Sequence, residues 1–286
     1  MKILMCSPEY FDVTYSINPW MSVENGVDAK LAIKQWNDLV ILLERVGAEV
    51  IQMSGKPNLP DLVFTANAGL NCGSHILLSN FKFPERQPEK QVYKDWFEGN
   101  GYICKELPDD IIFEGAGDVL SRKGVDSGFE LYLGSGFRTD EATYDSAVWK
   151  SSFQTPINTK MKLIDPYFYH LDTCFCPLPG DFALIYPGAF ETSKIEELNK
   201  RGKDDGTGFC GFRSAPILLK VPENEARKFA CNAVSVGNCV VLPSGCPETG
   251  EMLKKSGFEV HETDLSQYIL SGGSAKCLTF KLDSTQ

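Results

Sequence analysis

Short apolar segments recur along the chain at nearly constant intervals. Four of them have the length and composition of buried β-strands. With Leu77, Tyr132, Leu184 and Val240 as markers, successive segments lie 55, 52 and 56 residues apart. Regular spacing of this kind indicates repeated units that stack on one another to bury their apolar faces. The four segments are 76–79, 131–134, 183–186 and 239–242.

A second recurring pattern is an amphipathic helix that runs into a glycine and then into a strand. It ends at Gly47, Gly101 and Gly257, where glycine allows the left-handed conformation that stops a helix. The chain therefore predicts about five ββαβ units, and five such units can close into a ring. We predict an α/β fold, a five-bladed α/β propeller around a central active site, in a single catalytic domain over residues 1–286. A mixed α/β sandwich with accidental spacing is the alternative.

One stretch interrupts this repeat. Residues 192–214 are polar, charged and rich in glycine, and they lie between two apolar strands. Such a composition is typical of a surface loop. We therefore expect a loop insertion here, either a solvated loop or a lid over the site.

The composition is that of a globular protein, with 43% hydrophobic and 23% charged residues. The formal net charge of −10 argues against a surface that follows nucleic acid phosphates. No apolar run approaches the roughly 18 residues of a membrane helix, and the first nine residues do not form a secretory signal. We expect a cytoplasmic protein that binds a small molecule and no membrane. Oligomerisation is compatible with the sequence, but no pattern supports it.

Ten cysteines are scattered along the chain, and without an export signal we expect them to be reduced. Cys174 and Cys176 form the one close pair, and alternation along a strand would point their thiols to opposite faces. No second pair completes a tetrahedral metal site. His75 and His261 lie in ordinary strand contexts and are interpreted as structural. We therefore predict no metal site.

Polar residues interrupt five glycine-rich strand ends, one in each predicted unit. They offer carboxylates, amides, an imidazole and a thiol. In a closed ring, all five segments would converge on the axis and share one pocket. The segments are 61–69, 113–118, 170–173, 230–234 and 272–280.

Cys277 and His170 form the candidate catalytic pair. A thiolate nucleophile needs a nearby base or a depressed pKa, and histidine is its usual partner. Glu114 would hold the imidazole in its working orientation. Asp172, two residues after His170, is expected to share its strand face. Because surplus carboxylates repel an oxyanion and bind a cation, the set favours attack on a guanidinium or amidinium carbon over peptide hydrolysis.

Each of these residues also has a structural interpretation. Cys277 could be one of the core cysteines. Glu114 and Asp118 could satisfy backbone N–H groups around the neighbouring glycines. Asp61 could do no more than cap a turn. Individually, none of these signals identifies an active site.

Taken together, the segments resemble the guanidino-group-modifying, or pentein, superfamily. They are most similar to the arginine dihydrolases and their arginine deiminase and dimethylarginine dimethylaminohydrolase relatives. The resemblance extends from residues 17–21 to residues 275–279 and leaves out only 192–214. It implies a five-bladed propeller, with Cys277 after Gly-Gly as nucleophile and His170 of His-Leu-Asp-Thr as general acid and base.

The resemblance also assigns the contacts to substrate. Glu114 of Glu-Gly-Ala-Gly-Asp and Asp172 would hold the guanidinium group. Arg86 and Arg138 would grip the α-carboxylate, which fits the bidentate pairing of arginine with carboxylates. The other residues expected to bind substrate are Asn18, Phe64, Asn67 and Asp118.

Asn67 distinguishes two branches of this superfamily. Arginine deiminases carry Asp at this place in Thr-Ala-Asn-Ala-Gly, whereas the dihydrolases carry Asn. An amide can bind guanidinium or urea-like groups without requiring a full charge, so citrulline would stay reactive. The resemblance thus implies an arginine dihydrolase that uses an amidino-thioether intermediate, releases ornithine, two ammonia and carbon dioxide, and needs no cofactor. The alternatives are an arginine deiminase, a dimethylarginine dimethylaminohydrolase, an amidinotransferase and an inactive arginine-binding sensor.

Overall fold

The strands form five three-stranded sheets. The computed structural model describes residues 1–123, 129–153, 157–201 and 216–283. Helices alternate with the strands along the chain, which confirms the predicted α/β class. The accidental-spacing alternative, a mixed sandwich, does not match five separate sheets of equal size.

Four of the sheets follow one pattern along the chain. The first strand pairs antiparallel with the second, a helix follows, and the third strand returns parallel to the second. This is the predicted ββαβ unit. The units are β3 (Gly69–Cys72), β4 (His75–Leu78), α2 (Glu89–Gly99) and β5 (Ile103–Lys105); β6 (Val119–Lys123), β7 (Phe129–Ser135), α3 (Ala147–Ser152) and β8 (Ile157–Lys162); β9 (Phe175–Leu178), β10 (Phe182–Ile185), α4 (Thr192–Arg201) and β11 (Ile217–Lys220); and β12 (Val234–Val236), β13 (Cys239–Pro243), α6 (Pro247–Lys255) and β14 (Glu259–Thr263).

The fifth sheet is assembled from both ends of the chain. Strand β1 (Lys2–Cys6) pairs parallel with β2 (Glu49–Met53), which follows helix α1 (Ala29–Arg45). The other neighbour of β1 is β15 (Phe280–Lys281), which pairs antiparallel with it. The segment after Cys277 is therefore fixed against the N-terminal strand.

The four predicted apolar segments are the middle strands β4, β7, β10 and β13. A middle strand has a hydrogen-bonded neighbour on both sides, and its sheet is covered by helices, so its side chains are shielded from water. The marker residues Leu77, Tyr132, Leu184 and Val240 are accordingly all buried. The predicted repeat is thus confirmed at its most buried positions.

The three predicted helix stops are also confirmed. Gly47, Gly101 and Gly257 follow α1, α2 and α6 with φ angles of 99°, 84° and 92°. Side chains other than hydrogen rarely adopt this conformation, which explains why glycine recurs at this point of the unit.

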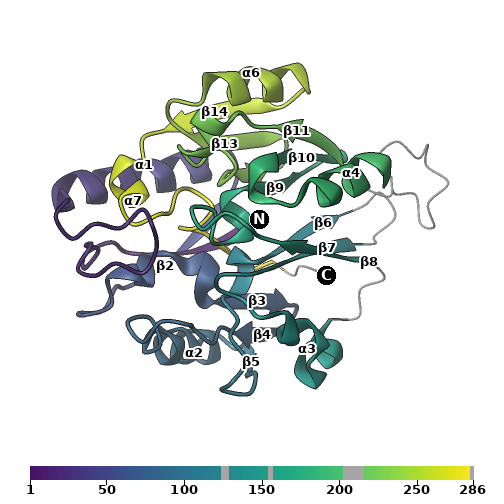
Figure 1. The fold of residues 1–286 in the computed structure, drawn as a ribbon. Helices are drawn as coiled ribbons and strands as arrows, with labels where there is room; N and C mark the ends of the chain where they lie inside the picture. The colour runs from purple at the N-terminus through teal and green to yellow at the C-terminus, as the bar shows by residue number, and fades with distance from the viewer. Residues whose placement is uncertain (124–128, 154–156, 202–215, 284–286) are drawn as a thin grey trace.

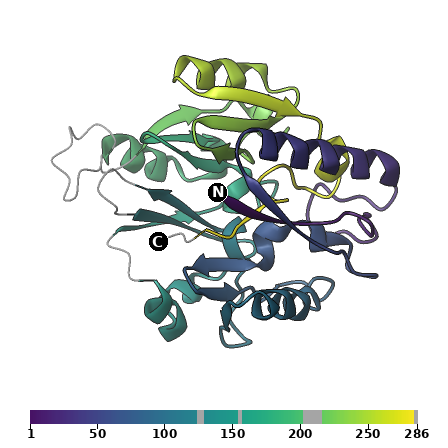
Figure 2. The same ribbon diagram turned by 180° about the vertical axis from the view of Figure 1, so that it is seen from behind.

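Helices α1, α2, α3, α4 and α6 lie at the periphery, and the strands lie between them (Figures 1 and 2). The buried apolar side chains form four clusters. In the described part of the chain, no helix has both the length and the apolar character for a membrane span. The remaining helical segments are short: α5 (Glu223–Ala226), α7 (Ser266–Ile269), and the 3₁₀ turns η1 (Pro60–Val63), η2 (Thr65–Ala68), η3 (Gly115–Gly117), η4 (Glu141–Asp145), η5 (Leu171–Thr173) and η6 (Pro187–Ala189).

The predicted loop insertion at 192–214 is wrong over its first part. Residues Thr192–Arg201 form helix α4, which lies between β10 and its parallel neighbour β11. Its apolar face is narrow, with Ile195 and Leu198 as its buried positions, so the polar residues dominate the sequence pattern. This helix is a regular member of its unit. Residues 202–214 lie outside the described residues.

Candidate active site

A small pocket lies where polar segments of different units meet. Its free volume is about 10 Å³, roughly the space of one water molecule. It contains most of the residues that the sequence assigned to an active site. The predicted residues that line it are Asn18, Phe64, Asn67, Arg86, Arg138, His170 and Cys277.

The same local geometry places these polar residues in successive units. Each lies a few residues before the strand that pairs antiparallel with the middle strand of its sheet, and three of the four lie on a 3₁₀ turn or directly before one. Asn67 lies on η2 before β3, and Glu114 directly precedes η3 before β6. His170 directly precedes η5 before β9, and Cys277 lies before β15. Equivalent positions in repeated units therefore face one another, although they are far apart in sequence.

The thiol of Cys277 is held by Asn232 and Asp172. The Asn232 side chain accepts hydrogen bonds from the backbone N–H groups of Cys277 and Ser274, both at 3.1 Å, and donates to the Cys277 sulfur at 3.1 Å. The thiol itself lies 3.5 Å from a carboxylate oxygen of Asp172. Burial, and then the charge of Asp172, raise the pKa of Cys277 well above its ordinary value. By itself, the buried thiol therefore stays protonated at neutral pH.

Asp172 is nevertheless mostly ionised at neutral pH. Burial raises its pKa to about 6, against the opposing charges of Lys276 and His170. A buried carboxylate beside a buried thiol is an unfavourable arrangement unless a cation compensates it. The pair thus creates a site with a strong preference for a positively charged group.

His170 is oriented by Glu114. The His170 Nε2 atom lies 2.8 Å from the Glu114 carboxylate, and this leaves Nδ1 for proton transfer. Burial raises the pKa of Glu114, but Arg138 and His170 together outweigh it and hold the carboxyl well below its usual range. The ionised Glu114 carboxylate thereby holds the imidazole ring in one orientation. The orienting role of Glu114 in catalysis stays a prediction.

Arg86 and Asn67 form one wall of the pocket. Arg86 makes two hydrogen bonds to Glu89, at 2.9 and 2.8 Å, and a third to the Asn67 side-chain oxygen at 3.0 Å. The Asn67 amide nitrogen donates to the backbone oxygen of Glu114 at 3.0 Å. These bonds fix the orientation of the amide and link it to the residue that holds His170.

Arg138 lies on another side of the pocket. It donates to Glu114 at 3.0 Å and to the backbone oxygen of Ile17 at 2.9 Å, and it packs on the rings of Phe83 and Tyr169. Its guanidinium is therefore held in place before any substrate arrives. The predicted grip of Arg86 and Arg138 on a carboxylate stays a prediction.

Two sequence-based expectations differ from the geometry. Asp118 accepts bonds from the Thr139 hydroxyl and the Leu171 N–H, at 2.7 and 3.0 Å, and it lies behind His170 instead of lining the pocket. Asp172 was expected to share a strand face with His170. That expectation is wrong, because Asp172 lies within the 3₁₀ turn η5, and the turn directs the two side chains to different partners.

Sequence reasoning missed several residues that line the pocket or contact Cys277. Asn232 lies in one of the polar segments but received no role. Its position before β12 matches that of Asn67 before β3, so alignment of the units would have found it. Asp61 was considered a turn cap, but it lines the pocket and accepts bonds from Tyr15 and Ser271, at 2.9 and 3.0 Å. Tyr169 and Ser271 also line the pocket.

One further cluster of polar side chains lies outside the pocket. On β13 and β14, Cys239, Glu259 and His261 bring atoms that could bind a metal ion to within 4.8 Å of one another. His261 is bonded to Glu259 at 2.7 Å. The cluster is at the surface, and the catalytic pocket does not involve it.

Comparisons with known proteins find similarity to proteins named for the hydrolysis of arginine or dimethylarginine. The sequence matches the family described as N,N dimethylarginine dimethylhydrolase, eukaryotic, over residues 16–283. It is 39% identical, over 99% of this chain, to a bifunctional arginine dihydrolase/ornithine cyclodeaminase of Nostoc. The chain spans 38% of the length of that relative. It is also 34% identical to an N(G),N(G)-dimethylarginine dimethylaminohydrolase of Mycobacterium tuberculosis, with 98% of this chain and 85% of the relative covered.

Solved structures agree with these matches. The N-terminal domain of an arginine dihydrolase from the ornithine–ammonia cycle of cyanobacteria, bound to substrate, superposes with a TM-score of 0.87 at 37% identity. The match covers 99% of this chain and 98% of that domain. A variant of the same domain, covalently bound to a reaction intermediate, superposes with a TM-score of 0.85.

Proposed function

Because the chain belongs to the dimethylarginine dimethylaminohydrolase, or pentein, family, we propose that it hydrolyses the guanidinium group of free arginine as an arginine dihydrolase. The products are ornithine, two ammonia and carbon dioxide. Cys277, His170 and Glu114 are the catalytic residues. Asn67, Asp172, Arg86, Arg138, Asn18, Phe64 and Asp118 form or support the substrate-binding site.

We also propose that residues 1–286 form one catalytic domain, in which the five sheets close into a propeller. Two observations support this. The polar residues before the first strands of the units surround one pocket. The pairing of β15 with β1 joins the last segment of the chain to the first.

The first half-reaction begins with binding of the guanidinium cation beside Asp172. The positive charge of this cation compensates the buried carboxylate of Asp172, and it favours the thiolate form of Cys277. The proton of Cys277 passes to His170, and the sulfur attacks the guanidinium carbon. The C–N bond then breaks, the leaving nitrogen takes a proton from His170, and ammonia departs. The product is an amidino-thioether on Cys277.

Water completes the cycle. His170 accepts a proton from water, the resulting hydroxide attacks the same carbon, and the C–S bond breaks to restore Cys277. The product is citrulline. A second round replaces the amide nitrogen of the ureido group by sulfur and then by water. The carbamate that forms decays to carbon dioxide and ornithine, so that one arginine and two waters give one ornithine, two ammonia and one carbon dioxide.

Asn67 is the observation that carries the dihydrolase assignment. The side-chain amide lies in the pocket lining, and it is fixed by Arg86 and by the backbone of Glu114. A neutral amide can accept a hydrogen bond from a guanidinium or a ureido N–H, and it can donate one to a ureido oxygen. Citrulline therefore can be bound again after the first hydrolysis. A carboxylate at this place would favour the cation alone.

Dimethylarginine hydrolysis is the second candidate, and the family match over residues 16–283 favours it. The same thiol attack would then release dimethylamine and stop at citrulline. The pocket has a free volume of only about 10 Å³, so either substrate requires the residues that cover it to move. Because arginine is smaller than dimethylarginine, it requires a smaller movement of these residues.

Product analysis by mass spectrometry tests the proposal. The purified protein is incubated with arginine, with citrulline and with asymmetric dimethylarginine, and ornithine, citrulline, ammonia and dimethylamine are quantified. We expect ornithine with two ammonia per arginine, and ornithine from citrulline alone. Citrulline as the end product would indicate a deiminase, and dimethylamine as the main product would indicate the second candidate.

Two variants complete the experiment. Cys277→Ala removes the nucleophile and should abolish all products. Cys239→Ala removes a half-exposed thiol on β13 and should leave turnover unchanged, so it controls for thiol loss in general. Product from Cys277→Ala at the wild-type rate would disprove the mechanism.

A further inference from the structure

The side-chain amide of Asn67 is held by two groups that fix its orientation. Arg86 Nη1 donates a hydrogen bond to Asn67 Oδ1, and Asn67 Nδ2 donates one to the backbone oxygen of Glu114, both at 3.0 Å. A guanidinium only donates and a carbonyl oxygen only accepts, so the reversed amide would lose both bonds. Among the described residues this amide makes no other hydrogen bond, and one N–H of Nδ2 is therefore left for a ligand.

Arg86 is itself held by Glu89. Two hydrogen bonds, from Nε to Oε1 at 2.9 Å and from Nη2 to Oε2 at 2.8 Å, join the two side chains. A bidentate pair of this kind fixes the plane of the guanidinium, which also lies over the ring of Phe81. Because Nη1 lies in the same plane, the pair fixes the direction in which Nη1 donates to Asn67.

Glu89 cannot touch a ligand in the catalytic pocket. Its side chain is completely buried, and it is not among the described residues that line the pocket. Any effect of Glu89 on a bound ligand must therefore pass through Arg86 and Asn67, both of which line the pocket.

Gly117 makes room for the amide nitrogen beside His170. A Cβ atom at position 117 would lie 2.5 Å from Asn67 Nδ2 and 3.4 Å from His170 Cγ. The first distance is well below the roughly 3.5–4.0 Å of a normal van der Waals contact, so a larger residue would displace the amide. The amide nitrogen and the imidazole are thus neighbours in the wall of the pocket.

Arginine and citrulline make different demands on this amide. A guanidinium carries only N–H donors, whereas a ureido group also carries a carbonyl oxygen that accepts. Asn67 Oδ1 already accepts from the cationic Arg86, and a second cation that approaches it is repelled by the first. The remaining N–H of Nδ2 can donate to a ureido oxygen. The fixed orientation therefore favours citrulline more than a freely turning amide would.

We propose that Glu89 is a positioning residue for the second hydrolysis. Through Arg86 it holds the Asn67 amide so that an N–H of Nδ2 donates to the ureido oxygen of citrulline. The inference rests on the proposed dihydrolase function, because only that function requires citrulline to be bound again. A buried carboxylate outside the pocket thus helps to decide whether citrulline or ornithine is the final product.

Isothermal titration calorimetry of the Cys277→Ala protein tests the inference, because this variant binds ligands without turnover. L-Arginine and L-citrulline are titrated separately at pH 8. Burial raises the pKa of Glu89 to about 7, so the carboxyl is mostly ionised at this pH. The readout is the Kd for citrulline divided by the Kd for arginine. A merely structural defect weakens both ligands alike and leaves this ratio unchanged.

Three variants are made in the Cys277→Ala protein. Glu89→Gln replaces one acceptor oxygen of the pair by an NH₂ group, which allows the guanidinium to turn. We expect the ratio to rise about threefold to tenfold, as the loss of one hydrogen bond to citrulline predicts. Glu89→Asp, which keeps the charge and shortens the side chain, gives the same test where Glu89→Gln does not fold. Gly117 has no positive φ, so Gly117→Ala suits the backbone, displaces the amide and should also raise the ratio.

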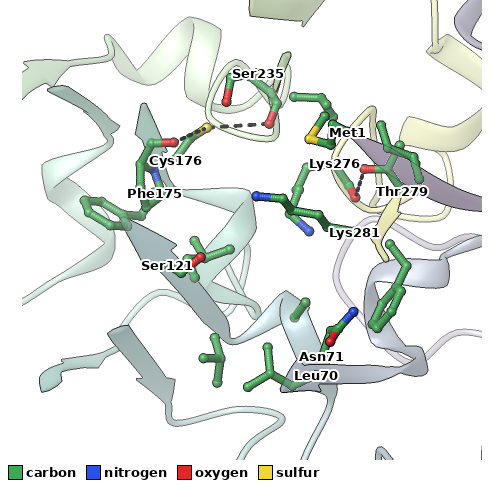
Figure 3. A pocket seen from close by; sticks show the side chains of 18 residues that line it. Met1, Leu70, Asn71, Ser121, Phe175, Cys176, Ser235, Lys276, Thr279 and Lys281 are labelled. Atoms are coloured by element: carbon green, nitrogen blue, oxygen red, sulfur yellow. Dashed lines mark hydrogen bonds between the residues drawn. The ribbon is translucent and has the colours of Figure 1, made fainter. Parts of the chain in front are cut away.

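Two control variants lie outside this chain of contacts. Glu130 is another completely buried carboxylate, bonded to Arg122 at 2.9 Å, so Glu130→Gln controls for the loss of a buried charge. Ser121 lines a second, larger cavity (Figure 3), which shares no described lining residue with the catalytic pocket. Ser121→Ala controls for a change in the wall of a cavity. Neither variant should alter the ratio.

Two results would overturn the inference. One is the absence of measurable citrulline binding to the Cys277→Ala protein. The other is an unchanged ratio in the folded Glu89 variant or in Gly117→Ala. Failure of the proposed function is measured separately, with the wild-type protein: citrulline as the end product from arginine would disprove the dihydrolase, and the Kd ratios would still decide the role of Glu89.

Discussion

The sulfur of Cys277 lies 3.5 Å from a carboxylate oxygen of Asp172, and both side chains are almost completely buried. Burial and the neighbouring carboxylate both disfavour the thiolate. A guanidinium bound beside the pair reverses this balance, because it places a positive charge next to both groups. Binding of a cationic substrate is thus coupled to activation of the nucleophile, and neutral or anionic esters and amides lack this effect.

The pH dependence of activity should follow Asp172. Its pKa is raised to about 6, first by burial, and only the ionised form attracts a guanidinium. We expect kcat/KM for arginine to fall on the acid side with an apparent pKa near 6. Asp172→Asn should lower kcat/KM by about 10²-fold or more, since a charged partner of the reacting group is lost. An acid limb that keeps the same midpoint in an active Asp172→Asn variant would contradict this assignment.

Asp172 should also make stability depend on pH. Because its pKa is raised in the folded state, the folded protein retains a proton that the unfolded chain releases, so the stabilising contribution is present at low pH. It is lost as pH rises through about 6. Relative to Asp172→Asn, the free energy of unfolding of the wild-type protein should fall by about 1–2 kcal/mol between pH 5 and pH 8, because the rest of the effect is already lost between the ordinary pKa of 3.8 and pH 5. Urea unfolding of both proteins at pH 5 and pH 8 measures the difference, and parallel changes in the two proteins would refute the prediction.

The buried pair of Arg86 and Glu89 should be important for folding. Both side chains are buried, and two hydrogen bonds join them. Burial raises the pKa of Glu89 to about 7, so the carboxyl is mostly ionised at pH 8. Glu89→Gln should then lower the free energy of unfolding by about 3–5 kcal/mol, since it leaves a buried guanidinium without its counter-ion.

The matched control for that pair lies on α1. Lys34 and Asp38 form an exposed ion pair at 2.6 Å, and exposed pairs contribute roughly 0–1 kcal/mol. Asp38→Asn should therefore change the free energy of unfolding by less than about 1 kcal/mol. Urea denaturation at pH 8 compares both variants, and equal effects would show that burial does not decide the outcome.

Asn232 should position the nucleophile and take no part in proton transfer. Asn232→Ala leaves the buried N–H groups of Ser274 and Cys277 without their acceptor, at a cost of about 1–3 kcal/mol for such groups. We expect kcat to fall at least about tenfold, with a smaller change in KM, because a displaced reacting group costs turnover. Asn238→Ala, which removes a surface amide bonded to Gly257, should leave kcat unchanged. Equal kcat in the two variants would argue against the positioning role.

Lys276 should act on Asp172 through its charge. Lys276 opposes the effect of burial on the pKa of Asp172. Lys276→Met should therefore raise that pKa further and move the acid limb of kcat/KM to higher pH, whereas Lys276→Arg should restore the wild-type profile. A parallel loss of activity at every pH would instead indicate a merely structural role.

Much of the fold could be predicted from the sequence, because its signals are local. The middle strands of these sheets are buried at nearly every position, so the apolar segments around Leu77, Tyr132, Leu184 and Val240 stand out. The helix stops at Gly47, Gly101 and Gly257 require a positive φ that glycine adopts most readily. Helix α4 was missed because only Ile195 and Leu198 mark its apolar face, and two positions do not establish a period.

The sequence by itself determined the repeated α/β unit and the reactive residue types, and through resemblance it suggested the roles that we propose for Cys277, His170 and Glu114. Only the tertiary structure decided which of these groups touch. Asp172 meets Cys277 across 105 residues, and Glu114 meets His170 across 56. Such contacts depend on how separate units pack together, and burial then sets the pKa of each group. The sequence pattern shows neither these contacts nor these pKa values, because hydrogen-bond partners and desolvation arise only when the units are brought together.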